Sequence, residues 1–139
     1  MKKTHSKKTL EIVRQWHLFD LNDQILGRVA TEIALLLMGK KKVNFSSHLD
    51  GGDYVVAVNC EKVKVTGKKS GQKKYYRHSG YPGGFRETTF RKQMEKHPME
   101  IIRHAVSGML PKNRLKEKRL FRLKLFVGDN HPYQDKLKN

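Results

Sequence analysis

The order of patterns along this sequence predicts an α/β domain, with helices on both faces of a small, largely parallel sheet. Short segments rich in β-branched and aromatic residues occur at 15–20, 54–59 and 123–127. Between them lie segments whose apolar residues recur three and four positions apart, the spacing of an amphipathic helix. Strands that alternate with helices favour parallel pairing. The length of 139 residues fits one such domain.

The first predicted strand covers residues 15–20. Trp16, Leu18 and Leu21 give it a pattern suited to a buried position in a sheet, and Asn22-Asp23 then marks a turn.

A helix is predicted from Leu26, and Gly39 is placed to end it. The triplet Lys40, Lys41 and Lys42 follows, where cations complement the helix dipole and can reach phosphate. The predicted inward face consists of Leu26, Val29, Ala30, Ile33, Ala34 and Leu37.

Residues 54–59, YVVAVN, are apolar on both faces and predict the central strand. A shorter strand is expected at 61–65. Another extended segment at 73–77 leads into a glycine-rich loop.

Two consecutive helices are predicted in the second half of the chain. Thr88 or Thr89 caps the first, which runs to Lys96, and Pro98 opens the second. A third, basic helical segment is expected from Pro111, before the last strand at 123–127. The apolar residues expected to face inward are Phe90, Met94, Ile101, Ile102, Ala105, Val106 and Met109.

The boundaries divide the chain into three parts. Residues 1–14 are a basic arm that we expect to become ordered on binding, 15–128 form the single domain, and 129–139 are a polar tail that we expect to be loose.

The charge of the chain favours nucleic acid as its partner. Thirty Lys and Arg against thirteen Asp and Glu leave a formal net charge of +17 and a pI near 10.1. The longest apolar run, residues 33–38, is too short to cross a bilayer, and the basic start has no apolar segment typical of a secretory signal. We therefore expect no membrane partner.

The positive charge is concentrated in two stretches. Residues 62–86 contain eight Lys or Arg and no acid, and residues 112–124 contain seven and one acid, Glu117. Surfaces that face only water usually mix both signs, so two such stretches favour contact with phosphates, Lys112 and Arg114 included.

The stretch at residues 73–84, KKYYRHSGYPGG, combines cations, aromatic rings and glycines. Cations contact phosphate, rings stack on bases, and glycines allow close approach of the backbone. Arg77, His78 and Tyr81 are the first candidates. Because neighbours in a strand face opposite sides, one of Tyr75 and Tyr76 is expected in the core and the other in solvent.

No pattern of a catalytic or metal site is complete. The segment TGKKS at 66–70 lacks the earlier glycine of a phosphate-binding loop, because Lys62 stands there. His48, Asp50 and Asp53 lack a completing His or Cys cluster, so we expect Asp53 to bond local backbone amides instead. Cys60, the single cysteine, is expected to be a small buried filler. We predict no enzyme, no cofactor and no metal.

Five segments, in this order, match the pattern of a known family: LGRVATEIA from Leu26, GDYVVAVNCEKVKVTG from Gly52, KKYYRHSGYPGG from Lys73, GMLPKN from Gly108 and LKLFVGDNHP from Leu123. Together they resemble the family of large-subunit ribosomal protein thirteen in its bacterial and organellar form. The resemblance implies a three-layer α/β/α domain on a four-stranded sheet that binds large-subunit (23S-type) ribosomal RNA and acts early in subunit assembly. It also implies neighbouring ribosomal proteins as partners, no small-molecule substrate, and a bacterial cytoplasm rather than an organelle, since no transit peptide is evident.

By position, the resemblance assigns RNA contacts to Arg77, His78, Tyr81, Gly83-Gly84 and Lys112. Charge and motif extend the predicted set to Lys40, Lys41, Lys42, Lys68, Lys69, Lys73, Lys74, Tyr75, Arg86, Arg114, Lys116 and Arg119. A regulatory module that binds messenger RNA or a protein away from the ribosome remains the alternative, because high charge alone permits it.

Overall fold

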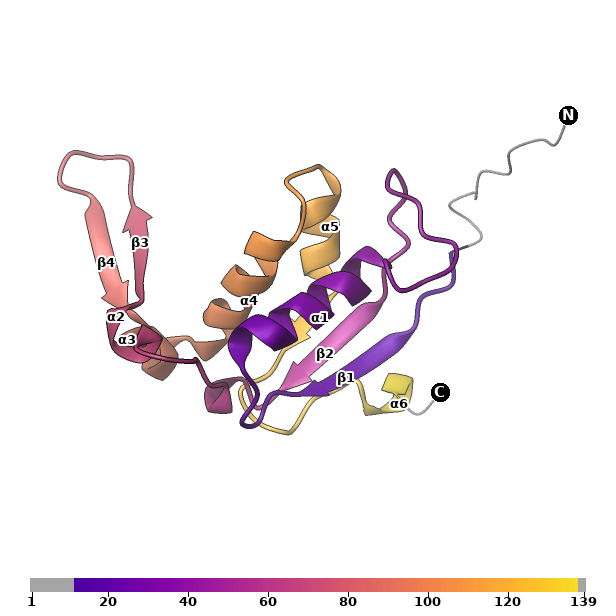
Figure 1. The fold of residues 1–139 in the computed structure, drawn as a ribbon, viewed down its shortest axis with the longest axis horizontal. Helices are drawn as coiled ribbons and strands as arrows, with labels where there is room; N and C mark the ends of the chain where they lie inside the picture. Colours follow the sequence, from indigo (N-terminus) through magenta and orange to yellow (C-terminus); the bar gives the residue numbers. More distant parts are fainter. Residues whose placement is uncertain (1–11, 138–139) are drawn as a thin grey trace, which may run out of the picture.

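The computed structural model describes residues 12–137, so most of the predicted N-terminal arm lies outside the described residues. The mixed α/β prediction is confirmed. The main sheet has three parallel strands rather than four, β1 (Trp16–Asp20), β2 (Tyr54–Val58) and β5 (Leu123–Leu125), in the order β1-β2-β5. A separate antiparallel pair, β3 (Lys74–His78) and β4 (Phe85–Thr89), completes the strands (Figure 1).

The prediction of a strand at 61–65 is wrong. Asn59 adopts a left-handed conformation (φ 57°), and the chain then forms a 3-10 turn, η2 (Cys60–Lys62). Only Lys64 makes an isolated parallel bridge with Ile25, through hydrogen bonds from Lys64 N to Gln24 O and from Leu26 N to Lys64 O. Extended pairing in this segment is therefore limited to a single position, beside the start of α1.

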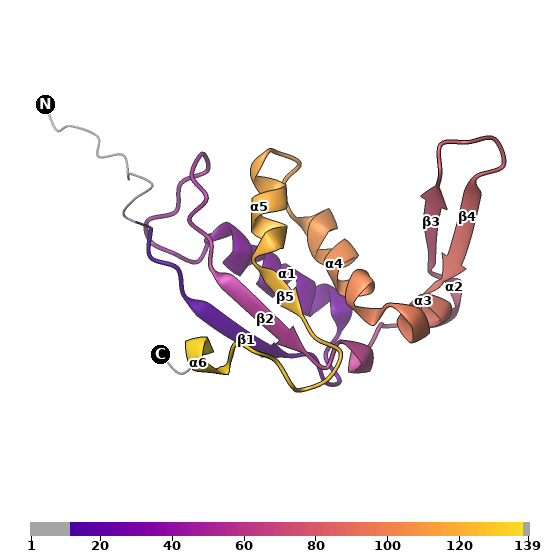
Figure 2. The same cartoon turned by 180° about the vertical axis from the view of Figure 1, so that it is seen from behind.

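One face of the sheet packs against α1 (Leu26–Met38) and α4 (Pro98–Met109), and this layer contains the apolar core. Seen from behind, the sheet lies in front of α1 (Figure 2). Gly39 ends α1 as predicted, with φ 75°, and the amide donors of Gly39 and Lys40 bond to Leu36 O and Leu35 O. Most of the predicted inward residues are buried, but Met94 and Ala105 are half-buried and Met109 is 41% exposed.

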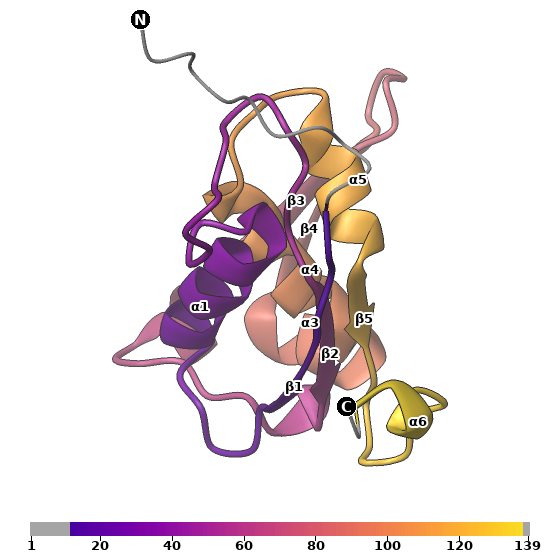
Figure 3. The ribbon, with the colours of Figure 1, turned by 90° about the vertical axis from the view of Figure 1, so that its right-hand side faces the viewer.

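The other face of the sheet is not covered by a layer of long helices, so the three-layer arrangement is not confirmed. Instead, the chain after β5 returns across this face and ends in the short α6 (Gln134–Leu137) (Figure 3). Trp16 stacks on Tyr54 (centroids 4.3 Å apart) and on Tyr133 (5.1 Å). These rings explain why the expected loose tail is packed on the sheet, whereas Leu18, on the same face, stays 51% exposed.

The remaining helices are short. Thr89 caps α3 (Phe90–Lys96) by accepting a hydrogen bond from Lys92 N, and Pro98 begins α4, both as predicted. The basic helix α5 (Leu115–Phe121) starts four residues later than expected. Asn113 explains this start, because its side chain accepts from Leu115 N after a turn that begins at Pro111. The last of the short helices is α2 (Lys69–Gln72).

The β3–β4 hairpin stands away from the main sheet, at the end of the molecule opposite the loop that follows α1 (Figure 1). Its first strand was predicted, within one residue, but the second, FRETT, was not. The hairpin loop, the loop before α5 and the loop after α1 all point to the same side of the molecule (Figures 1 and 2). No helix in the described part of the chain has the length and apolar character needed to span a bilayer.

Candidate nucleic-acid interface

The hairpin places two arginines directly opposite one another. In the antiparallel register, Arg77 pairs with Arg86, and both side chains are exposed. Like charges at paired positions of a sheet are destabilising. Within the described residues, neither guanidinium forms an ion pair. This arrangement favours an external anion that would relieve the repulsion.

The opposite face of the hairpin carries aromatic rings. Tyr76 and Phe85 stack with centroids 5.7 Å apart and planes 22° apart, and they are 66% and 58% exposed. Lys74 Nζ donates to both carboxylate oxygens of Glu87, at 3.0 and 3.1 Å. Exposed rings of this kind provide flat surfaces for a base or a ribose.

The hairpin loop depends on glycine. Gly83 has φ +72°, and a Cβ on Gly84 would lie 2.0 Å from Ser79 Oγ and 2.9 Å from Tyr81 O. His78 Nδ1 accepts a hydrogen bond from Gly80 N at 2.9 Å, so its Nε2 is left for contact outside the loop. Tyr81 is 75% exposed at the tip.

Tyr75 and Tyr76 point to opposite sides, as predicted for neighbours in a strand. Tyr75 is half-buried, with its ring edge-on to His104 at 5.6 Å and Lys73 Nζ 5.3 Å from its centroid. Burial raises the pKa of the Tyr75 hydroxyl. Its role is thus partly structural, because it anchors the hairpin to α4.

The exposed predicted cations fall into groups. Lys40 and Lys41 lie in the loop after α1, and Lys112 and Arg114 in the loop before α5, while Lys68 and Lys69 lie near the base of the hairpin. Lys116, in α5, is half-buried. We use the name tip surface for the three loops that point to one side: residues 79–84, 110–114 and 40–50. The fold brings these loops to one side from separate parts of the sequence.

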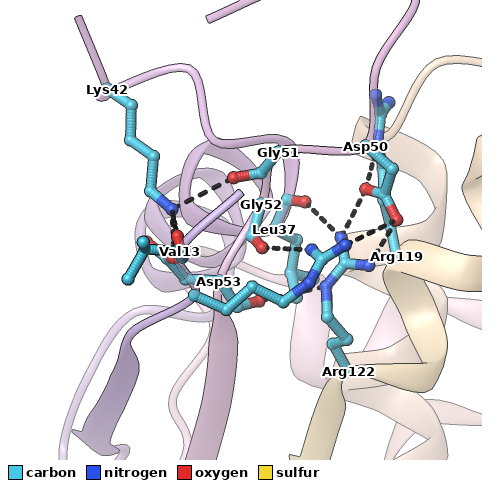
Figure 4. A network of polar contacts seen from close by, with 10 residues as sticks. Val13, Leu37, Lys42, Asp50, Gly51, Gly52, Asp53, Arg119 and Arg122 are labelled. Atoms are coloured by element: carbon cyan, nitrogen blue, oxygen red, sulfur yellow. Dashed lines mark hydrogen bonds and ion pairs between the residues drawn. The ribbon is translucent and has the colours of Figure 1, made fainter. Parts of the chain in front are cut away.

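Two residues that were predicted to contact RNA, Arg119 and Lys42, interact with other residues of the protein instead (Figure 4). Arg119 is 2% exposed and its Nε lies 3.7 Å from Asp50 Oδ1, so it lacks the exposure that an RNA contact requires. Lys42 Nζ donates to Asp53 Oδ1 and to the carbonyls of Val13 (2.8 Å) and Gly51 (3.1 Å). Both serve an internal ion-pair cluster instead.

Asp50 is the centre of this cluster. Arg122, 5% exposed, forms two hydrogen bonds with its carboxylate, one of them 2.6 Å from Nη2 to Oδ1, and also donates to Leu37 O at 3.0 Å. Burial alone would raise the pKa of Asp50, but the hydrogen bonds and charge of Arg122, together with Arg14 and Arg119, hold it below its usual value. Asp50 is therefore ionised and links α1 to α5.

Asp53 was expected to bond local backbone amides, but its partners come from distant parts of the chain. Its carboxylate accepts from Gln15 N (2.9 Å), distant in sequence, and from Lys42, with His17 Nε2 at 3.2 Å. Burial opposes ionisation here too, but the Lys42 and Gln15 hydrogen bonds lower the pKa of Asp53. Together the two aspartates fix the loop that follows α1, where Gly52 packs so closely on Leu37 O that a Cβ would lie 1.8 Å from it.

Sequence reasoning missed two sets of residues. Arg14 and Arg122 belong to the cluster, and only their distance along the chain from Asp50 hid them. A second set lines a groove between the hairpin and α3–α4, with Lys92, Lys96, His97 and His104 added to Tyr75, Arg77 and Arg86. The four-residue spacing of Lys92 and Lys96 on a helix was a signal that could have found them.

Comparison with known proteins gives a consistent result. The family model described as ribosomal protein L13 matches residues 14–132. A protein of Roseiflexus sp. (strain RS-1) named large ribosomal subunit protein uL13 is 50% identical over 131 residues, which cover 94% of this chain and 90% of that protein. Proteins of the same name from Lawsonia intracellularis and Leptothrix cholodnii are 54% and 52% identical, covering 94% of this chain and 91% and 92% of theirs.

Proposed function

The chain belongs to the ribosomal protein L13 family, and we propose that it binds large-subunit ribosomal RNA of the 23S type and supports early assembly of the subunit and translation. The family is structural and non-enzymatic, in agreement with the prediction of no enzyme. The relatives named above carry the name of a large ribosomal subunit protein and come from bacteria. We propose that this chain works in the large subunit of a bacterial ribosome, in the cytoplasm and in contact with neighbouring ribosomal proteins.

The observation that carries the proposal is the Arg77–Arg86 pair at the hairpin. Two exposed guanidiniums at opposed positions, close in sequence to His78 and the glycine loop, are stabilised by a phosphate between or beside them. Lys112 and Arg114 add a second basic loop on the same side of the molecule. The exposed cations of the predicted set neutralise phosphates, while rings and glycines fit the shape of the RNA.

Salt dependence of RNA binding tests the proposal. Each phosphate contact contributes about 0.7–0.9 to the slope of log affinity against log salt, so replacing Arg77 and Lys112 with alanine should flatten that slope by roughly 1.4–1.8. The matched control, Arg28→Ala with Arg103→Ala, removes the same charge from exposed positions outside the predicted contact set and outside both basic stretches. An equal change in both double variants would show that binding follows net charge alone.

Competition distinguishes the ribosomal role from the regulatory alternative. Binding to a large-subunit RNA fragment should survive a large excess of transfer RNA, and the protein in a cell lysate should sediment with the large subunit. Complete displacement by transfer RNA, or a protein that stays in the light fractions, would favour a free regulatory module instead.

A further inference from the structure

The groove between the hairpin and α3–α4 is a separate feature from the tip surface. It has a volume of about 650 Å³, and its lining comes from β3, β4, α3 and α4. Sites for single small molecules span roughly 300–1,000 Å³, a range that suits one nucleotide and is far too small for a duplex. The volume of the groove therefore fits a single nucleotide.

The charge of the groove is positive. Four cations line it, Arg77, Arg86, Lys92 and Lys96, against two carboxylates. Neither carboxylate is free: Glu87 pairs with Lys74 at 3.0 Å, and Glu100 accepts a hydrogen bond from Gln93 at 2.7 Å. Among the described residues, no ion pair holds any of the four cations. They remain available for a phosphate.

The groove also has aromatic walls. Tyr75, His97 and His104 line it, and the Tyr75 ring meets His104 edge-on at 5.6 Å. The Tyr75 hydroxyl is enclosed and has no hydrogen-bond partner in the part of the chain that the structure describes. Rings next to unpaired cations are the features with which proteins bind extruded bases of single-stranded RNA.

From these observations we propose that the groove binds one unpaired nucleotide of the RNA, with its phosphate on the Arg77–Arg86 and Lys92–Lys96 side chains and its base against Tyr75 and His104. This inference rests on the proposed function, because the Arg77–Arg86 pair that carries that proposal also lines the groove. It goes further by assigning Lys92, Lys96 and His104 to RNA and by requiring an unstacked base rather than a duplex.

Nuclear magnetic resonance of the full chain tests the groove directly. The probes are a single-stranded RNA hexamer and the same hexamer annealed to its complement. The single strand should shift the His104 ring and Thr88 methyl signals, which report on the groove, whereas the duplex should shift only the amides of Gly80 and Gly83 at the tip. Equal shifts of the groove signals by both probes would overturn the inference.

A pair of double variants provides the affinity test. Lys92→Ala with Lys96→Ala should weaken single-strand binding about 25-fold at 0.1 M salt, since one phosphate contact on a single strand contributes roughly fivefold there, and should leave duplex binding unchanged. The control, Arg28→Ala with Arg103→Ala, removes the same charge from exposed positions outside the groove and outside both basic stretches, and should leave both unchanged. Equal losses of single-strand affinity in the two double variants would refute the proposal that the groove binds a nucleotide.

The outcomes separate the two proposals. Tip signals that shift while groove signals stay fixed would overturn the nucleotide site and leave ribosomal RNA binding in place. If neither set responds to either RNA and no large-subunit fragment binds, both proposals fail.

Discussion

Removal of the Asp50 carboxylate should destabilise the protein strongly. Asp50 is the acid shared by Arg122 and Arg119, which are 5% and 2% exposed, and by the more exposed Arg14. Asp50→Ala leaves two buried guanidiniums without a carboxylate, a change that typically costs about 3–5 kcal/mol. Arg122 keeps its hydrogen bonds to Leu37 O and Asp53 O, so we expect the lower part of this range, about 3 kcal/mol.

Urea unfolding followed by circular dichroism measures this cost. With a slope of about 1.5 kcal/mol per molar urea, a loss of about 3 kcal/mol lowers the midpoint by roughly 2 M. Asp23→Asn is the matched control, because Asp23 and its partner Lys64 are 68% and 64% exposed, such pairs contribute about 0–1 kcal/mol, and asparagine tolerates the positive φ (59°) of this position. Equal midpoints for the two variants would refute the role of Asp50 as the centre of a buried cluster.

Three further predictions follow from the same structure. Because the folded pKa values of Asp50 and Asp53 lie below the unfolded value near 3.9, their stabilisation should be complete above about pH 5 and be lost as the pH falls through the folded values. Urea midpoints from pH 7 to 2.5 check this, and Asp53→Asn should make the acid loss shallower; an unchanged profile would contradict the assignment. Gly84→Ala should weaken RNA binding but change the free energy of unfolding by less than about 1 kcal/mol, because the hairpin loop lies outside the core. Gly71→Ala is the control, since a Cβ there meets nothing within 4 Å, and it should change neither RNA binding nor stability. Val56→Asp places a carboxylate at a position with 0% exposure and should prevent folding, and a soluble variant with a native spectrum would show that the central strand is misplaced.

The parts of the fold with a regular apolar period could be predicted from the sequence. Leu26 to Leu37 repeats at three and four positions and is followed by a glycine, so α1 and its end at Gly39 were found. The run from Tyr54 is apolar on both faces, which identified the central strand β2. In both segments burial depends on local pattern, and local pattern is visible in a sequence.

The predictions that failed concern parts of the fold that depend on contacts between distant residues. The strand FRETT at Phe85–Thr89 has little apolar alternation and is held by pairing with β3 rather than by burial. Val63 and Val65 alternate like a strand, but the left-handed Asn59 turns the chain before them. The tail was expected to be loose because its composition is polar, yet Tyr133 reaches Trp16.

The sequence identified candidate contact residues, but it could not separate the exposed ones from the buried one. Arg77, His78, Tyr81 and Lys112 are exposed, but Arg119 could not be told from its exposed neighbours by charge alone. Its burial follows from Asp50, 69 positions earlier, and a sequence gives no sign of which arginine a given aspartate will meet. The four-residue spacing of Lys92 and Lys96 places them on one side of a helix, but the groove that they line exists only once the hairpin has folded beside α3 and α4.

Ultraviolet crosslinking in cells, followed by purification of this chain, tests the central claim most directly. Sequencing identifies the RNA, and mass spectrometry identifies the crosslinked peptides. The proposed function predicts crosslinks on one region of large-subunit ribosomal RNA, with the modified residues concentrated in the hairpin at 74–89 and the loop at 110–114. Crosslinks spread over many messenger RNAs, with none on ribosomal RNA, would contradict it.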